Sequence, residues 1–371
     1  LMLGCTPGQC HYDFGTRRAE EVFHTARELM LRLGYPAPCL QLDRIEAADG
    51  DGWVQSVQSF ADGIPPQPEP ISPDAISNAA VCTNEPAPTL EDIVTRHRAW
   101  YCLDCGKCSS VCPVTPRETR RYCSPRIMVE QALDNPLDEW IADPLFWSCT
   151  TCQHCSLMCP SNVSFSDFLR EARQVARRNG RAGECTHGDV VQTWGRMMTR
   201  PERRPDRLQW LDDDDTLRVS DDSDILYFVG CAPYYDILFQ HLDVEGTQIP
   251  RAAVKILNHL GIAPQVLADE RCCGHDQFWE GEIQTFQALA RLNLEQIIRS
   301  GAKNIVTTCP ECARTLAVDY PRLVGNHGLK VQHLTEFVSR NLNRSGAVLN
   351  VNPLAKKATF QDPCRLGRHM G

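Results

Sequence analysis

The chain has 371 residues, ordinary apolar content, twenty cysteines and a formal net charge of −9. This length suits two or three domains, and the negative charge argues against a nucleic-acid-binding protein, which needs a basic face. No apolar run is long enough to span a membrane. Secreted disulfide proteins are usually short and begin with a signal peptide, which this chain does not show, so we expect metal-binding cysteines in a reducing, anaerobic cytoplasm.

Residues 1–62 alternate between strand and helix patterns and predict an α/β fragment. Strands are expected at 1–4 and 40–45, and helices at 17–33 and 52–60. A strand that begins at residue 1 suggests that sequence lies upstream. Residues 63–90 hold seven prolines, a density that disfavours helix and central strand, and they are expected to form a semi-extended linker.

Residues 91–200 carry two copies of the spacing C-x2-C-x2-C-x3-C-P, which is typical of bacterial two-cluster ferredoxins. In that arrangement the fourth cysteine of each run binds the cluster of the other run. One [4Fe–4S] cluster is therefore assigned to Cys102, Cys105, Cys108 and Cys159, and the other to Cys149, Cys152, Cys155 and Cys112. Zinc sites and disulfides are less consistent with this pattern, because zinc sites usually pair two C-x2-C units.

Helices are also expected in this region, at residues 90–101, 125–133 and 166–178, which predicts a helix-rich ferredoxin-like domain. The charged stretch 201–223 is expected to be a solvated loop. Residues 224–371 return to alternation, with strands at 225–229, 265–268, 304–308 and 358–361 and helices at 250–260, 282–299 and 311–318. This order predicts a C-terminal α/β domain with a mainly parallel sheet, and an α/β and α+β multidomain protein overall.

Cysteines follow each predicted strand of the last domain: Cys231, then Cys272-Cys273-Gly274, then Cys309 and Cys312, and finally Cys364. Open parallel sheets build their sites at the carboxyl ends of the strands, so these groups should converge. Neighbouring thiolates can bridge several irons, and a glycine lets the backbone approach closely. A redox dithiol at Cys309 and Cys312 is the alternative, but the additional thiols favour an iron–sulfur cluster.

The pattern from Cys231 to Cys312 resembles the CCG domain of heterodisulfide reductase B-type subunits. That resemblance implies a non-cubane [4Fe–4S] cluster held by five cysteines, which here are Cys231, Cys272, Cys273, Cys309 and Cys312. Residues 362–368 look like the opening of a second CCG half, whose own Cys-Cys-Gly is absent from this sequence. Either the polypeptide continues, or the second site is lost.

Two further segments carry resemblances. Residues 91–200, including Tyr122-Cys123-Ser124-Pro125-Arg126, resemble the C-type subunit of the same enzyme. Residues 4–12, Gly-Cys-Thr-Pro-Gly-Gln-Cys-His-Tyr, look like the delta subunit of its partner hydrogenase, which implies a [2Fe–2S] cluster with Cys5 and Cys10 among its ligands and earlier ligands upstream. A pair of ordinary turn cysteines is the alternative interpretation.

The other cysteines and the histidines beside the motifs have simpler interpretations. The four cysteines outside the motifs are expected to be small buried hydrophobes: Cys39, Cys82, Cys123 and Cys185. The histidines next to the ligands are expected to be hydrogen-bond donors or spectators, because every cluster is complete without them: His11, His154 and His275.

The resemblance implies an electron-relay subunit of a heterodisulfide-reductase-like complex. Its partners would be an A-type flavoprotein subunit and a hydrogenase, a formate dehydrogenase or another electron donor or acceptor. No G-x-G-x-x-G fingerprint follows a strand, so flavin-based electron bifurcation is expected in a partner rather than on this chain. The alternatives are an iron–sulfur subunit of a quinone-linked glycerol-3-phosphate or 2-hydroxy-acid dehydrogenase, and a zinc-binding scaffold. Catalysis by the chain itself stays open, because no acid–base or triad arrangement is present.

Overall fold

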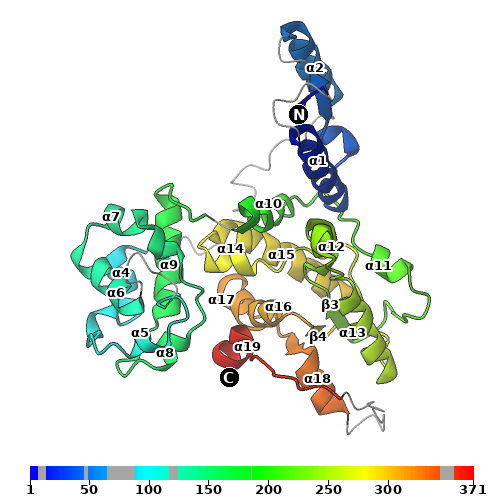
Figure 1. Cartoon of the computed structure of the whole chain (residues 1–371). Coiled ribbons are helices and arrows are strands. Elements are labelled where there is room, and N and C mark those ends of the chain that lie inside the picture. The colour runs from blue at the N-terminus through cyan, green and yellow to red at the C-terminus, as the bar shows by residue number, and fades with distance from the viewer. Residues whose placement is uncertain (7–13, 46–48, 65–87, 117–123, 185, 343–354) are drawn as a thin grey trace.

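The computed structural model describes residues 1–6, 14–45, 49–64, 88–116, 124–184, 186–342 and 355–371. It shows a helix-rich protein with two small parallel sheets, which confirms the predicted fold class. A bundle of short helices lies on one side, a sheet-containing domain lies on the other, and the N-terminal segment projects from them (Figure 1). Within the described residues, no helix is both long enough and apolar enough to cross a membrane.

The N-terminal segment pairs two parallel strands and carries two helices, as its alternation predicted. The strands are β1 (Met2–Cys5) and β2 (Leu42–Ile45), and the helices are α1 (Gly15–Arg32) and α2 (Gly50–Gly63). Helix α1 is anchored because Leu29 and Leu33 pack in one apolar cluster with Tyr234 and Ile237. The predicted linker lies largely outside the described residues.

The helical bundle surrounds the two cysteine runs. Its elements are α4 (Leu90–Arg96), the 3-10 turn Ala99–Tyr101, α5 (Lys107–Val111), α6 (Pro125–Asp134), α7 (Leu137–Ala142), the 3-10 turn Pro144–Trp147, α8 (His154–Leu157) and α9 (Phe165–Arg178). The single helix predicted for residues 90–101 is wrong. Arg98 adopts a left-handed conformation with φ 61°, which breaks the helix, and the carbonyl of His97 accepts instead from Ser164.

The charged stretch 201–223 is only partly the solvated loop that its composition predicted. Arg207 and Trp210 are 1% and 3% exposed, and Trp210 lies in the short helix α11 (Gln209–Asp212). Trp210 packs against the sheet-containing domain, in one apolar cluster with Tyr227 and Val254. The preceding helix α10 (Val190–Met197) packs against α14 (His275–Trp279) and joins the bundle to that domain.

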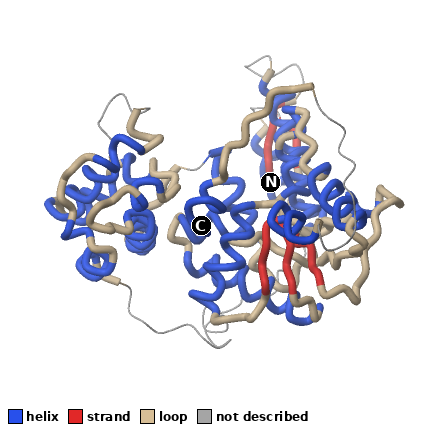
Figure 2. Tube along the Cα trace, turned by 90° about the horizontal axis from the view of Figure 1, so that it is seen from below, coloured by secondary structure: helices blue, strands red, loops and turns tan. Residues whose placement is uncertain are grey.

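The C-terminal domain contains a three-stranded parallel sheet in the order β3 (Ile225–Phe228), β4 (Asn304–Thr307) and β5 (Lys330–His333). Side chains that alternate along β3 enter two different cores, because successive residues of a strand point to opposite faces. Leu226 and Phe228 join the core beneath α15 (Ile283–Ser300), whereas Tyr227 joins the core beneath α13 (Gln248–His259) and α18 (Leu334–Asn341). Helices thus cover both faces of the sheet (Figure 2).

Two predicted strands are absent from the described residues. Residues 265–268 contribute one isolated bridge, between Gln265 and Leu226, because the chain then turns to place Glu270 beneath β3. Residues 358–361 lie in an exposed loop without a pairing partner. The alternation did not predict β5, α12 (Ala232–Leu238) or α18, and the helix predicted at 311–318 is α16 (Pro310–Arg314) followed by a π-helical turn, Thr315–Asp319.

Candidate metal centres

The two ferredoxin-type runs fold into loops of the same shape. Asp104 and Thr151, which precede the second cysteine of each run, have φ angles of 52° and 49°. Gly106 and Gln153, which follow that cysteine, have φ angles of 74° and 67° and cap α5 and α8. A left-handed conformation costs a residue other than glycine about 1–2 kcal/mol, so the surrounding structure imposes this loop on both runs.

The thiols of the second predicted set line one pocket. Its lining includes Cys149, Cys152 and Cys155 of the second run together with Cys112 of the first, and the pocket is partly open to solvent. Apolar walls come from Met128 and Phe165, among others. The fourth cysteine of one run therefore lies beside the first three of the other. This donor set, four sulfurs around a largely apolar cavity, fits an iron–sulfur cube.

The thiols of the first predicted set lie nearer the surface. Cys102, Cys108 and Cys159 are half-buried beside the apolar core of the bundle, whereas Cys105 is exposed. The backbone N–H of Val163 donates to the sulfur of Cys159 at 3.4 Å, as that of Thr151 donates to Cys149 at 3.3 Å. Such N–H···S bonds are one of the means by which a protein sets a cluster's reduction potential.

Burial disfavours the thiolate form of these cysteines when no metal is bound. Desolvation raises the pKa of Cys108, Cys149 and Cys155 above the ordinary value for a thiol. Iron binds thiolates, so a cluster held by these cysteines would have to offset this desolvation, and its assembly would release the thiol protons.

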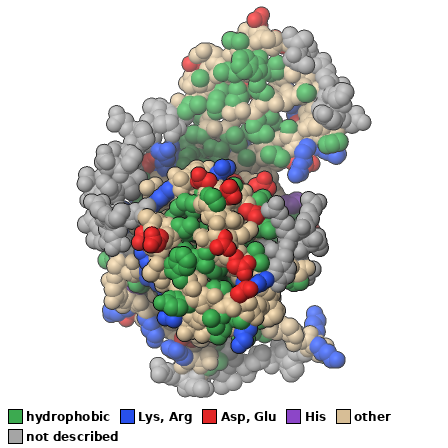
Figure 3. All heavy atoms as spheres, turned by 90° about the vertical axis from the view of Figure 1, so that its left-hand side faces the viewer, with side chains coloured by type: hydrophobic (Ala, Val, Ile, Leu, Met, Phe, Trp, Pro, Cys, Tyr) green, Lys and Arg blue, Asp and Glu red, His purple; other side chains and the backbone are tan. Residues whose placement is uncertain are grey.

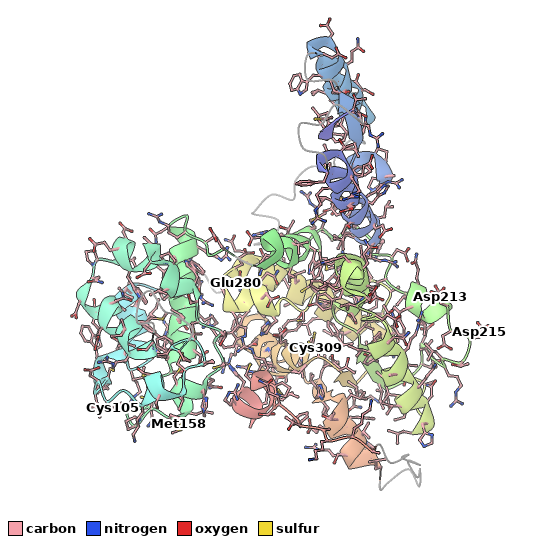
Figure 4. The ribbon with its side chains drawn as sticks, in the orientation of Figure 1. Cys105, Met158, Asp213, Asp215, Glu280 and Cys309 are labelled. Carbon is pink, nitrogen blue, oxygen red and sulfur yellow. The ribbon has the colours of Figure 1, made fainter. Side chains whose placement is uncertain are left out.

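Five thiols meet at the carboxyl end of the sheet in the C-terminal domain. Cys309 caps α16 after β4 (Figure 4), Cys231 follows β3, and Cys312 lies in α16. The sulfurs of Cys231 and Cys272 are 3.9 Å apart. Cys272 accepts hydrogen bonds from the thiols of Cys231 and Cys273, which holds the pKa of Cys272 well below its ordinary value.

The other three thiols of this group are also in contact with one another. The Cys312 thiol lies within hydrogen-bonding reach of Cys273 and Cys309, and its hydrogen bond to Cys309 lowers the pKa of Cys309. A Cβ atom at Gly230 would lie 3.2 Å from the sulfur of Cys312, so glycine leaves room for the thiols. Five buried or half-buried sulfurs in one group provide a soft donor set that suits an iron–sulfur cluster.

A buried ion pair supports this group, and the sequence patterns did not indicate it. Glu270 accepts from the backbone N–H of Val229 and Gly230 at 2.9 and 2.8 Å, directly before Cys231. Arg207 donates to that carboxylate at 2.7 Å and to the carbonyl oxygens of Glu270 and Gly230 at 2.6 Å each. Because Glu270 lies two residues before Cys272, the pair holds two of the cysteine-bearing segments together.

The remaining cysteines and histidines named in the sequence analysis differ in burial and in their place in the fold. Cys364 is half-buried at the start of α19 (Cys364–Met370), a helix packed against α16, and does not follow a strand as expected. Cys5 is half-buried at the end of β1, and Cys39 is half-buried rather than buried. His154 is exposed on α8, whereas His275 is 6% exposed. Five of the predicted positions lie outside the described residues: Cys10, His11, Cys82, Cys123 and Cys185.

Comparison with protein families finds three domains in the predicted order. Residues 1–65 match the family of the methyl-viologen-reducing hydrogenase delta subunit, residues 87–163 match the 4Fe–4S dicluster domain, and residues 225–317 match the cysteine-rich domain. The resemblance inferred from the motifs is thereby confirmed. The chain therefore carries, in this order, domains similar to a hydrogenase delta subunit, a 4Fe–4S dicluster domain and a cysteine-rich domain.

The curated relatives agree with this assignment. The D-type subunit of dihydromethanophenazine:CoB–CoM heterodisulfide reductase from Methanosarcina barkeri is 34% identical over 171 residues, which are 45% of this chain and 39% of that protein. EtfAB:quinone oxidoreductase of Syntrophomonas wolfei is 33% identical over 39% of this chain and 19% of its own length. The B-type subunit of fumarate reductase (CoM/CoB) from Methanothermobacter marburgensis is 25% identical over 76% of this chain and 54% of its own length.

The chain thus aligns with well under two thirds of each of these relatives. No solved structure matches it.

Proposed function

We propose that the chain is the electron-transfer subunit of a heterodisulfide-reductase-like complex, in an anaerobic cytoplasm. The pocket that Cys112 shares with Cys149, Cys152 and Cys155 carries the proposal, because this crossed set of thiols is what a two-cluster ferredoxin needs. The names of the relatives, which include subunits of reductases, support the same class of function.

The proposed ligand sets are those of the sequence motifs. One [4Fe–4S] cluster is assigned to Cys102, Cys105, Cys108 and Cys159, and a second to Cys149, Cys152, Cys155 and Cys112. A non-cubane [4Fe–4S] cluster is assigned to Cys231, Cys272, Cys273, Cys309 and Cys312. Cys5 and Cys10 are proposed as two ligands of a [2Fe–2S] cluster. Bound clusters would supply one-electron transfer, while the chain holds them through thiolates and adjusts their potentials through N–H donors and buried charge.

An apolar surface beside Cys105 supports electron exchange with a partner protein. We define this surface by five side chains that are 46–70% exposed: Trp100, Tyr101, Leu103, Leu157 and Met158. Figure 3 shows hydrophobic side chains scattered over the side of the bundle that faces away from the C-terminal domain. Helices α5 and α8 of the two runs are in contact, and Figure 4 shows Cys105 and Met158 at the outer edge of the bundle. Exposed apolar patches of this kind mark interaction sites, and here the patch adjoins an exposed candidate ligand.

The proposed occupant of this surface is a redox subunit of the complex. An A-type flavoprotein, a hydrogenase or a formate dehydrogenase fits the domain order, and any flavin-based electron bifurcation would then take place in the partner. The hydrogenase-delta-type segment favours this assembly over a quinone-linked dehydrogenase.

Purification of the native complex without oxygen tests the proposal. Iron and sulfide are quantified, EPR spectra are recorded at stepped potentials, and co-purifying subunits are identified by mass spectrometry. We expect two cubane signals, a further distinct cluster signal and a flavoprotein partner. Zinc in place of iron would exclude electron transfer, and a membrane dehydrogenase partner would favour the quinone-linked alternative.

A further inference from the structure

The helical bundle and the C-terminal domain share a tightly fitted contact. Arg177 of α9 donates to the carbonyl oxygen of Glu280 at 2.7 Å and to its carboxylate at 2.9 Å. Gly281, with φ 81°, lies so close to α9 that a Cβ atom there would overlap the backbone nitrogen of Gln174. The position of one candidate metal centre relative to the other is therefore set by direct packing.

A single arginine reaches from α19 to both centres. Arg365 is 4% exposed, and its Nε donates to Nε2 of His275 at 2.8 Å, two residues after Cys273. Its two terminal nitrogens donate to Thr151, one to the hydroxyl at 2.8 Å and one to the carbonyl oxygen at 3.0 Å. Thr151 directly precedes Cys152. The guanidinium also lies 4.1 Å from the ring centre of Trp279, which fixes its plane.

A second arginine makes a parallel connection from α9. Arg173, also 4% exposed, donates at 2.9 Å to the carbonyl oxygens of Trp147 and Cys149 and at 3.2 Å to that of Trp279. Two buried guanidinium groups thus donate both to the segment that carries the second cysteine run and to the segment 275–279 that follows the Cys-Cys-Gly. The rigid fork of arginine, with five donors, suits such a bridge and a lysine cannot reproduce it.

The first cysteine run lacks this connection in the part of the chain that the structure describes. Asp104 occupies the position that Thr151 occupies in the second run, and its side chain is 58% exposed and paired with Arg126 of the same bundle. Cys105 beside it is exposed next to the apolar surface, whereas Cys152 is half-buried and its carbonyl oxygen accepts from Arg368 at 2.8 Å. The two loops have one backbone shape but face different neighbours.

We infer that Arg365 and Arg173 are positioning residues that fasten the second cysteine run to the five-thiol group, so that electrons pass between these two centres and the first run exchanges electrons with the partner. This inference rests on the proposed function. One electron moves at a time: the donor centre is oxidised and the acceptor centre reduced, and the partner supplies or removes that electron.

The bridge has an electrostatic consequence. Reduction adds negative charge to a centre, and a fixed guanidinium nearby stabilises that charge. Arg365 and Arg173 therefore raise the reduction potential of the second cubane relative to a site without them. Removal of one guanidinium should shift that potential to a more negative value and leave the potential of the first cubane unchanged.

Redox titration of arginine variants in the intact native complex tests the inference. The two cubane EPR signals are first assigned with Cys105→Ser and Cys152→Ser. In Arg365→Gln we expect the reduction potential of the cubane assigned with Cys152→Ser to become more negative. The reduction potential of the cubane assigned with Cys105→Ser should stay unchanged. Rapid-freeze samples should show that electrons reach the five-thiol centre more slowly. Arg365→Lys retains the positive charge, so the reduction potential of the second cubane should stay close to the wild-type value. The rate of electron transfer to the five-thiol centre should remain low.

Arg340→Gln is the matched control, because Arg340 is exposed and pairs with Glu336 on α18. Unchanged potentials and rates in Arg365→Gln would overturn the inference, as would equal shifts of both cubane signals. Hydrogen exchange provides a second readout: amides of residues 149–155 should exchange faster in Arg365→Gln than in the control. Absence of cubane signals from the wild-type complex would instead refute the proposed function, so the two failures are distinguishable.

Discussion

Arg207 and Glu270 form an ion pair at 2.7 Å in which both side chains are at most 1% exposed. Their hydrogen bonds tie the end of β3 to the segment that carries Cys272 and Cys273. A buried pair of this kind contributes little net stability compared with apolar residues, but loss of one partner leaves an uncompensated buried charge. The pair therefore acts mainly through the placement of the cysteine-bearing segments.

Replacement of Glu270 with alanine should destabilise the protein strongly. Because Arg207 would keep a buried charge without its partner, we expect a loss of about 3–5 kcal/mol in the free energy of unfolding. Anaerobic denaturant titration measures this loss. Glu336→Ala is the control, since Glu336 belongs to an exposed pair one helical turn apart that is worth only about 0.3–0.5 kcal/mol. Equal losses in both variants would contradict the role assigned to the buried pair.

Serine in place of Cys273 should remove the five-thiol cluster and spare the cubanes. Cys273 lies in the middle of the sulfur group, between Cys272 and Cys312, so its loss opens that set of donors. We expect about four fewer iron atoms per chain and loss of one EPR signal. Cys39→Ser, at a half-buried cysteine outside every motif, should keep the full iron content. Persistence of all signals in Cys273→Ser would show that the assignment of this site is wrong.

The fourth cysteines of the two runs should have crossed effects. Cys112 lies in the pocket of the second run, so Cys112→Ser should perturb the same EPR signal as Cys152→Ser. Cys159→Ser should perturb the same signal as Cys105→Ser. Spectra of the four variants, recorded at one poised potential, check this pairing. If each fourth cysteine instead affected the signal of its own run, the crossed assignment would be wrong, and each cluster would take all four ligands from one run.

The proximity of Cys112 to the second run was predictable because its signal is local. Spacing alone placed Cys112 with the second run, and the structure brings its thiol into that pocket. The supporting residues were not predictable in this way. Arg365 and Thr151 are 214 residues apart, and Arg207 and Glu270 are 63 apart, so no pattern within a short window links them.

Errors in the predicted elements have a similar origin. Residues 265–268 resemble a strand in composition, but Glu270 must reach the backbone of Gly230, and the chain leaves the sheet after one bridge. Arg207 lies in a stretch whose charge predicted solvent exposure, yet it is buried because its partner is a distant carboxylate. Tertiary pairing outweighed local composition in both cases.

Charge introduced into the apolar surface beside Cys105 should slow electron exchange with the partner. Leu103→Glu and Met158→Glu place a carboxylate where an apolar contact is proposed, and we expect roughly a tenfold lower rate of partner-dependent reduction. Iron content should stay unchanged. Leu242→Glu is the control, because Leu242 is 60% exposed on the C-terminal domain and Leu103 is 70% exposed. If Leu242→Glu lowered the rate of partner-dependent reduction equally, the cause would be a general loss of charge complementarity. Docking at the surface beside Cys105 would then not explain the decrease.

Alanine at Gly281 should loosen the contact between the bundle and the C-terminal domain. Gly281 and Gly301 have similar left-handed φ angles of 81° and 73°, so alanine costs each about 1–2 kcal/mol in backbone strain. Only at Gly281 would the new Cβ meet the backbone of α9, whereas nothing lies within 4 Å at Gly301. We expect a further loss of about 1–3 kcal/mol at Gly281 and faster hydrogen exchange in the second half of α9. Equal unfolding free energies and equal exchange in the two variants would show that the packing of α9 against Gly281 does not hold the two centres together.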